Sequence, residues 1–295
     1  MKTIYIAIAS LDDEELVPTV LNAFETADNP SRVFIGVSLL AEDKWRKKHF
    51  QTSVKKYKKN IKFESFRLNK KTMSMLTVGN ARKRAMSLYR GEDYFLQIDS
   101  HALFAKGWDT TLISEYEDAK KFVKNDKVVL TAYAGYYEYD SSGNRVFSDP
   151  EKTVIENGWL QFPYFVAGHY YHNTIPKWDL VPPKRMAEMS KYRFLPAVKF
   201  NANFAFSSGA FTKESGLYED AEFFEEEVLQ TLNLIKLGYS LVYPNLPDPL
   251  IGHLYGVKMS KEHGFRMSKG DYLSDNYVLS ETLAGDNYLK YLKDP

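Results

Sequence analysis

The sequence contains no cysteine among its 295 residues and no long run of apolar residues. Without cysteine the chain can form no disulfide framework and offers no thiolate for catalysis. No apolar stretch approaches the roughly 18 residues that a membrane-spanning helix requires. The first residues form an apolar strand pattern directly, without the features of a secretory signal peptide. These absences exclude a disulfide-stabilised secreted domain and a membrane protein, so we expect a cytoplasmic protein.

Acidic residues are scarce in one part of the chain. Between Lys44 and Lys71 there are twelve lysine and arginine residues and a single acid, Glu64. The whole chain nevertheless has a formal net charge of only +1, so the remainder is net acidic. The neutral total therefore conceals a basic part that can attract a polyanion.

Strand and helix patterns alternate along the first half of the sequence. The expected strands cover 3–9, 32–39, 61–67, 94–98 and 127–134, and the expected helices cover 14–26, 44–59, 75–89 and 108–123. Such alternation predicts an α/β, Rossmann-like fold with a mostly parallel central sheet that is flanked by helices. Ligands bind beyond the carboxyl ends of the strands in sheets of this kind.

The second half of the sequence is less regular. Residues 136–139 and 145–147 flank a turn-rich stretch and predict a hairpin. Further patterns predict a strand at 200–207, a helix at 222–237, and strands at 239–243 and 251–255. The segment 148–198 is irregular and rich in aromatic residues, and long segments of this kind are usually functional. We expect one domain over 1–256, in which 148–198 is an insertion on the acceptor side, followed by a C-terminal segment, 257–295.

One apolar strand ends in an acid, a small residue and an imidazole, at Asp99, Ser100 and His101. Residues i and i+2 of an extended segment point the same way, so Asp99 and His101 can hold one ion between them. An oxygen ligand with a nitrogen ligand suits a divalent cation such as Mn²⁺ or Mg²⁺, and such ions commonly bridge substrate phosphates. The alternative is a strand-end turn with a solvated histidine.

Three blocks of sequence resemble a glycosyltransferase of the GT-A fold. They are Ala81 to Asp109, which contains the Asp-Ser-His motif, Phe204 to Ser207, and Phe223 to Tyr255. The chain is most similar to the cytosolic protein-hydroxyproline N-acetylglucosaminyltransferases, which share the Asp-x-His motif with the polypeptide N-acetylgalactosaminyltransferases. The resemblance covers most of residues 3–256. It implies a GT-A fold, a UDP-sugar donor, and Mn²⁺ or Mg²⁺ held by Asp99, His101 and His253.

The resemblance also implies which residues hold the donor. The expected donor contacts are Ser10, Leu11, Asp12, Arg82, Asp99 and Ser100. The first three follow the first strand, where GT-A enzymes grip uridine and ribose. Asp12 or Asp13 can instead cap the helix that follows. Arg82 would steady the diphosphate or the uracil, although as one of three consecutive basic residues it can equally belong to a solvated face.

An acidic pair, Glu226 and Glu227, opens the helix in the third block. The resemblance places such a pair beside the sugar and the acceptor, where a carboxylate can deprotonate the attacking hydroxyl or orient the sugar. The alternative is ordinary acidic enrichment in a first helical turn. We expect Glu226 and Glu227 to be catalytic, with their roles undivided.

The acceptor is predicted from charge. Phosphate-neutralising lysines with interleaved aromatic residues, here Trp45, Phe50 and Tyr57, are the pattern expected for nucleic-acid contact. The candidate residues are Lys44, Lys47, Lys48, Lys55, Lys56, Lys58 and Lys59. We therefore favour 5-hydroxymethylcytosine in DNA as the acceptor, modified with glucose or arabinose as in phages of the T-even type. A phage-encoded enzyme of this kind would act in the host cytoplasm.

Two other hypotheses stay open. The resemblance favours a hydroxyproline, serine or threonine hydroxyl on a cytosolic protein as the acceptor. A third possibility is a non-catalytic module that binds nucleotide sugars or nucleic acid, against which the set Asp99, His101 and His253 argues. The identity of the sugar and the stereochemical outcome cannot be predicted from the sequence.

Overall fold

A computed structural model gives the architecture of most of the chain. It describes residues 1–41, 44–67, 77–132, 134–148, 166–171, 175–180, 193–197, 200–216, 223–244, 246 and 249–254. The expected C-terminal segment, 257–295, and most of the expected insertion, 148–198, lie outside the described residues.

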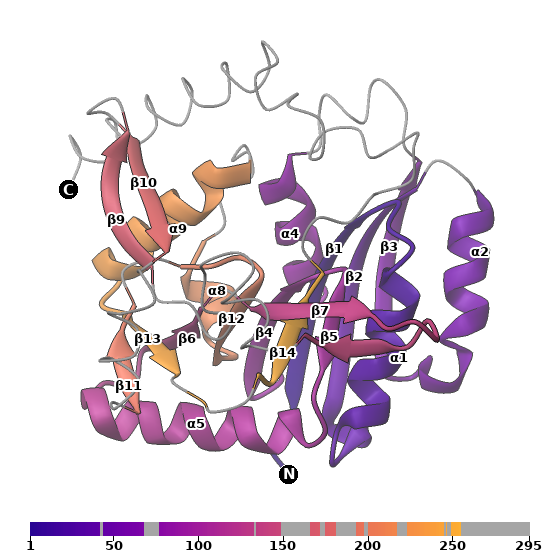
Figure 1. The fold of residues 1–295 in the computed structure, drawn as a ribbon, viewed down its shortest axis with the longest axis horizontal. Coiled ribbons are helices and arrows are strands. Elements are labelled where there is room, and N and C mark those ends of the chain that lie inside the picture. The colour runs from indigo at the N-terminus through magenta and orange to yellow at the C-terminus, as the bar shows by residue number, and fades with distance from the viewer. Residues whose placement is uncertain are drawn as a thin grey trace.

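An eight-stranded sheet forms the centre of the molecule (Figure 1). Its strands, in spatial order, are β11 (Phe194–Pro196), β13 (Ser240–Pro244), β6 (Val128–Thr131), β12 (Phe204–Ser208), β4 (Tyr94–Asp99), β1 (Ile4–Leu11), β2 (Val33–Ala41) and β3 (Ile61–Arg67). The pairs β4·β1, β1·β2, β2·β3 and β13·β6 are parallel. Strand β12 runs antiparallel to both β4 and β6, and β11 runs antiparallel to β13. The predicted mostly parallel sheet is confirmed.

Helices cover both faces of this sheet. One face packs against α1 (Leu16–Thr26), α2 (Lys44–Ser53) and α5 (Trp108–Val123), and the other against α4 (Val78–Ser87), α8 (Phe211–Glu214) and α9 (Phe223–Lys236). Because side chains alternate along a strand, Ile4, Ile6 and Ile8 of β1 join the first core, whereas Tyr5 and Ala7 join the second. Each fully buried isoleucine stabilises the fold by roughly 1.5–3 kcal/mol. This burial on both faces explains the near-continuous apolar sequence of β1.

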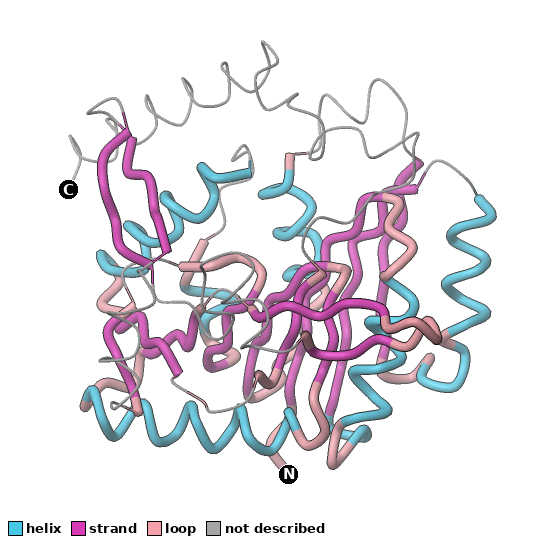
Figure 2. Tube along the Cα trace, viewed as in Figure 1, coloured by secondary structure: helices cyan, strands magenta, loops and turns pink. Residues whose placement is uncertain are grey.

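A second, smaller sheet has strands that run across those of the central sheet in the view of Figure 2. Its order is β5 (Ala102–Phe104), β14 (Ile251–His253), β7 (Gly135–Tyr139) and β8 (Arg145–Phe147). The sequence predicts the β7–β8 hairpin and the strand that contains β14, but not β5. Two short 3-10 helices, η1 (Pro30–Arg32) and η2 (Lys55–Tyr57), complete the first half.

Several expected boundaries are corrected by the structure. The segment expected to be irregular contains the antiparallel pair β9 (Val166–Tyr171) and β10 (Ile175–Leu180) as well as β11, because aromatic and β-branched residues favour strands. The strand expected from residue 200 begins only at Phe204, because side chains hold the preceding backbone. The amides of Phe200 and Asn201 donate to the hydroxyls of Thr231 and Thr131. No helix in the described part of the chain is both long and apolar enough to cross a membrane.

Candidate functional site

The two sheets bring three predicted metal ligands to one place. Asp99 is the last residue of β4, and the chain turns through Ser100 and His101 directly into β5. Strand β14 pairs with β5 so that His253 lies opposite Ala102, beside His101. Residues 154 positions apart in sequence therefore meet at the carboxyl end of the central sheet, where ligands bind in folds of this type.

The side chains of Asp99, His101 and His253 converge closely enough to hold one ion. Their potential ligand atoms all lie within 4.8 Å of one another. Nε2 of His253 lies 3.0 Å from Oδ2 of Asp99, and the two imidazole rings meet edge to face with centroids 4.5 Å apart. One carboxylate and two imidazoles fit Mn²⁺ better than Mg²⁺, which prefers oxygen ligands.

The charge state of Asp99 is set by its neighbours. Burial alone would raise the pKa of this carboxyl, but the Arg82 guanidinium and His253 outweigh burial and hold the pKa well below its usual range. Asp99 is thus an anion at neutral pH. Burial is also the largest influence on His253, and it lowers the pKa of that imidazole. An ionised carboxylate and a neutral imidazole are the forms that bind a metal ion.

Arg82, from helix α4, joins the candidate metal site to the acidic helix. Its Nη2 lies 2.7 Å from Oδ1 of Asp99, and its Nη1 lies 2.6 Å from Oε2 of Glu226. The Arg82 side chain is only 8% exposed, which excludes the solvated basic face. The structure therefore brings three predicted site residues together, with one guanidinium between two carboxylates.

Glu226 and Glu227, the predicted acidic pair, lie in two different environments. Glu226 is buried against Arg82, and burial raises the pKa of its carboxyl to about 7 although Arg82 opposes that shift. Its other oxygen, Oε1, is buried and has no hydrogen-bond partner among the described residues. Glu227 instead accepts a 2.9 Å hydrogen bond from the amide of Ala202 and thereby holds the turn that precedes β12. Glu226 is thus the acid that shares Arg82 with Asp99, and Glu227 supports the backbone.

The predicted donor contacts at and just after the end of β1 differ in exposure. Ser10 is buried, whereas Leu11 is 43% exposed. Asp12 has a left-handed backbone, with φ of 46°, and its carboxylate forms an ion pair of 3.0 Å with Arg46 of α2. Asp is among the few side chains that adopt this conformation readily. The hydroxyl of Ser100 is not directed to an open surface, because it donates to Asp13.

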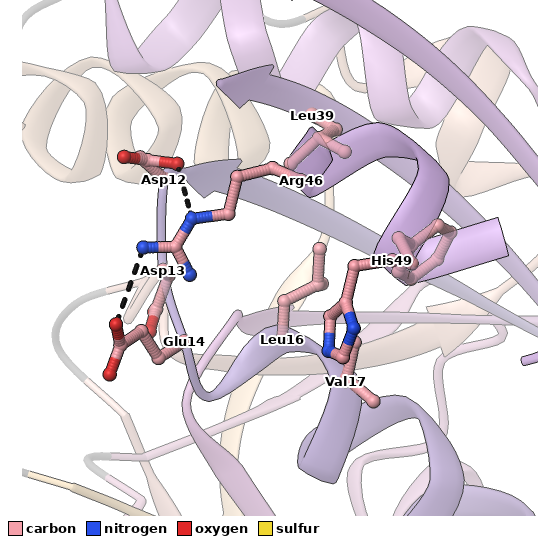
Figure 3. Close-up of a pocket in the computed structure, with 9 residues that line it drawn as sticks. Asp12, Asp13, Glu14, Leu16, Val17, Leu39, Arg46 and His49 are labelled. Atoms are coloured by element: carbon pink, nitrogen blue, oxygen red, sulfur yellow. Dashed lines mark hydrogen bonds and ion pairs between the residues drawn. The ribbon is translucent and has the colours of Figure 1, made fainter. Parts of the chain in front are cut away.

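A cavity of about 200 Å³ lies beside Asp12 (Figure 3). It is lined by Asp12, Asp13, Glu14, Leu16, Val17, Leu39, Arg46, His49 and Phe50. Arg46 reaches across the cavity from α2 to Asp12 and, at 3.3 Å, to Glu14. Helix α2 is therefore adjacent to the strand end that was predicted to hold the nucleoside.

The sequence predicts for Asp13 only an alternative role, as a cap of the helix that follows. In the structure its Oδ2 lies 2.7 Å from Nδ1 of His101 and accepts the hydroxyl of Ser100 at 2.5 Å. Burial would raise the pKa of Asp13, but the bond to His101 leads the contacts that lower it. The contact joins residues 88 positions apart, and a local sequence pattern carries no signal for it.

The predicted phosphate-binding lysines are all exposed, and we term them together the lysine face. It consists of Lys44, Lys47, Lys48, Lys55, Lys56, Lys58 and Lys59, on α2, η2 and the turn after it. Within the described residues none of the seven forms an ion pair with an acid. The expected interleaving of aromatic residues is not confirmed, because Phe50 is 1% exposed and Tyr57 stacks on Phe24 at 4.1 Å. Both rings pack in or against the hydrophobic core.

Comparisons with known proteins bear on the family and the fold of this chain. The family model described as glycosyltransferase (GlcNAc) matches residues 3–75 and 77–263. No curated protein matches the sequence. A solved structure of GalNAc-T7 with UDP, GalNAc and Mn²⁺ is similar at a TM-score of 0.61 and 13% identity, over 86% of this chain and 44% of that one. The first 349 residues of S. aureus TarS give a TM-score of 0.47 at 14% identity, over 86% of this chain and 60% of that one.

This chain thus spans less than half the length of the GalNAc-T7 chain. The likeness to GalNAc-T7 shows a shared GT-A fold, which confirms the predicted fold class. The family model reaches across β1, the Asp-Ser-His motif, α9 and β14, and so includes every element that builds the site. Because that family model matches most of this chain, the chain belongs to the glycosyltransferase (GlcNAc) family.

Proposed function

We propose that this chain transfers a sugar from a UDP-sugar to a hydroxyl group, with a divalent cation held by Asp99, His101 and His253. The acceptor oxygen forms a bond to the anomeric carbon, and the bond from that carbon to the β-phosphate oxygen breaks. UDP leaves with the electron pair, and the hydroxyl proton passes to a base. When bound, the cation would neutralise the charge that develops on the departing diphosphate.

The convergence of one carboxylate and two imidazoles at the sheet edge is the observation that carries this proposal. Arg82 also supports the proposal. Its guanidinium forms an ion pair with Oδ1 of Asp99, whereas Oδ2 lies beside His253. The carboxylate is therefore oriented before any ligand arrives. Preorganisation of this kind is the main means by which protein groups stabilise developing charge.

Glu226 is the group best placed to take the proton. A general base works best when its pKa lies near the working pH, and burial raises the pKa of Glu226 to about 7. Its buried, unpartnered Oε1 is an acceptor without a donor in the described residues. Glu227 has a backbone partner instead, so we assign the base role to Glu226 alone.

Release of UDP tests the transfer reaction. A panel of UDP-sugars is incubated with the protein in Mn²⁺ and in EDTA, and UDP is quantified. We expect metal-dependent release, and we expect Asp99→Ala to abolish it. Asp118→Ala removes a surface carboxylate of α5 and serves as the matched control, with release unchanged. Release that is equal in EDTA, or that survives Asp99→Ala, contradicts the proposal.

We propose 5-hydroxymethylcytosine in DNA as the acceptor, because the lysine face offers seven exposed cations. Helix α2, which carries part of this face, is joined to the site edge by the ion pairs of Arg46 with Asp12 and Glu14. Unpaired lysines gain most from neutralising phosphates and releasing counterions. A duplex held on this face would have to extrude its modified base to reach the anomeric carbon.

Salt dependence separates this acceptor from a protein hydroxyl. Transfer is measured by mass spectrometry on hydroxymethylated DNA, unmodified DNA and hydroxyproline peptides. Mutation of Lys55, Lys56, Lys58 and Lys59 to glutamine should lower the salt slope of turnover by about one for each lysine that contacts a phosphate. The matched control changes four exposed lysines elsewhere, namely Lys2, Lys106, Lys121 and Lys213. Transfer to the peptide with an unchanged salt slope would establish the protein acceptor instead.

A further inference from the structure

The carboxylate of Asp13, at the turn between β1 and α1, accepts hydrogen bonds from three donors. Its Oδ1 accepts the amide of Glu15 at 2.9 Å, and its Oδ2 accepts the Ser100 hydroxyl at 2.5 Å. The same Oδ2 lies 2.7 Å from Nδ1 of His101, and the Asp13 side chain is only 5% exposed. A buried carboxylate needs such partners, because burial without them is costly. Two of the three donors belong to the Asp-Ser-His motif.

The backbone of this turn places Asp13 where it can reach the motif. Asp12 adopts its left-handed conformation, and its amide donates to the carbonyl of Leu40 at 2.7 Å. That bond ties the end of β1 to β2 and reverses the course of the chain before α1. The next residue, Asp13, then lies over the end of β4, against Ser100 and His101.

The contact with Asp13 decides which nitrogen of His101 is available. A carboxylate only accepts hydrogen bonds, so Nδ1 of His101 carries the proton and donates it to Asp13. In the neutral imidazole, the form that binds a metal ion, the lone pair is then on Nε2. A carboxylate on the second nitrogen of a metal-binding histidine also holds the plane of the ring and increases the basicity of the ligand nitrogen.

We propose that Asp13 is a positioning residue of the metal site, which presents Nε2 of His101 to the cation. This inference rests on the proposed metal-dependent function. In this role Asp13 acts on the cation through His101 and is not itself a metal ligand. The competing explanation is a purely structural role, in which Asp13 supports the start of α1 through the amide of Glu15.

Two substitutions separate these explanations. Asp13→Asn retains the shape of the side chain and an oxygen for Glu15, but its amide group offers a donor to Nδ1 and favours the wrong tautomer of His101. Asp13→Ser retains a short acceptor at the start of the helix and cannot reach His101. The control is Asp109→Asn, because Asp109 is a fully buried carboxylate that accepts the amides of Asp28 and Asn29 remote from the site.

The experiment measures Mn²⁺ binding to the full chain by electron paramagnetic resonance, with no substrate present. Loss of a hydrogen bond to the second nitrogen of a metal-binding histidine typically weakens metal binding 10- to 100-fold. We expect both Asp13 variants to lose affinity for Mn²⁺ by about this factor. Pulsed spectra should show two coupled histidine nitrogens in the wild type and one in Asp13→Asn. Asp109→Asn should lose stability in thermal unfolding while retaining wild-type affinity and both nitrogens.

The outcomes distinguish this proposal from the proposed function. If the wild type shows no Mn²⁺ bound through histidine, the proposed function fails. If the wild type binds as expected but either folded Asp13 variant retains its affinity and both nitrogens, the positioning role is overturned. Weaker binding by Asp13→Ser with an unfolding temperature near that of the wild type would establish that role, because serine can replace the structural contact.

Discussion

The pairing of Arg82 with two buried carboxylates makes a quantitative prediction about stability. At pH 8, Glu226 is ionised, and Arg82→Met leaves Asp99 and Glu226 without their cation. Removing one partner of a buried ion pair costs about 3–5 kcal/mol, and here one guanidinium serves two anions at 2.7 and 2.6 Å. We therefore expect Arg82→Met to lower the free energy of unfolding by about 4 kcal/mol.

A double-mutant cycle isolates the contact between Arg82 and Glu226. Glu226→Gln removes one of the two stranded charges, so the double variant should regain part of the loss. We expect a coupling energy of about 1.5–3 kcal/mol. A cation bound beside Asp99 would partly replace the positive charge of Arg82. Unfolding in urea is therefore followed by circular dichroism with EDTA present.

The matched control lies on the same helix. Arg84 is 3.8 Å from Glu64, and both side chains are about two fifths exposed. Exposed pairs contribute roughly 0–1 kcal/mol, so Arg84→Met should cost less than about 1 kcal/mol. A loss below about 1 kcal/mol for Arg82→Met, or a coupling energy near zero, would refute the shared buried pairing.

Two further predictions concern the core and the acidic pair. A Cβ on Gly36 would lie 1.7 Å from the Tyr5 hydroxyl, so Gly36→Ala should destabilise the protein by about 1–3 kcal/mol or more, as measured by urea unfolding. Burial raises the pKa of Glu226 from 4.5 to about 7, so the folded state binds this proton more tightly than the unfolded state. The resulting stability is complete below about pH 4.5 and is lost as pH rises through 7, by on the order of 3 kcal/mol. Unfolding curves across this range should show that loss in the wild type and not in Glu226→Gln.

The sequence predicts the central sheet well, because its signals are local. Strands such as β3 and helices such as α5 follow from apolar periodicity and have the expected bounds. The strand end at Asp99 follows from the same kind of signal. The three-residue strand β5 is too short for a periodic pattern, and it forms by pairing with the distant strand β14.

The candidate site is predicted less completely, because it depends on distant contacts. His253 was identified from the family resemblance, since its approach to His101 depends on the pairing of β14 with β5. Asp13 was missed because its partner is remote in sequence. The sequence does not predict that α2 turns Phe50 toward the core, because which face of that helix packs inward depends on contacts with distant strands. The role of the lysines in binding nucleic acid stays a prediction.

The position of a bound cation tests the central claim most directly. Crystals of the full chain grown with Mn²⁺ and UDP would be measured at the manganese absorption edge. We predict one anomalous peak between Asp99, His101 and His253, bridged to the diphosphate of UDP. A peak at other residues, or UDP bound elsewhere on the fold, would contradict the account.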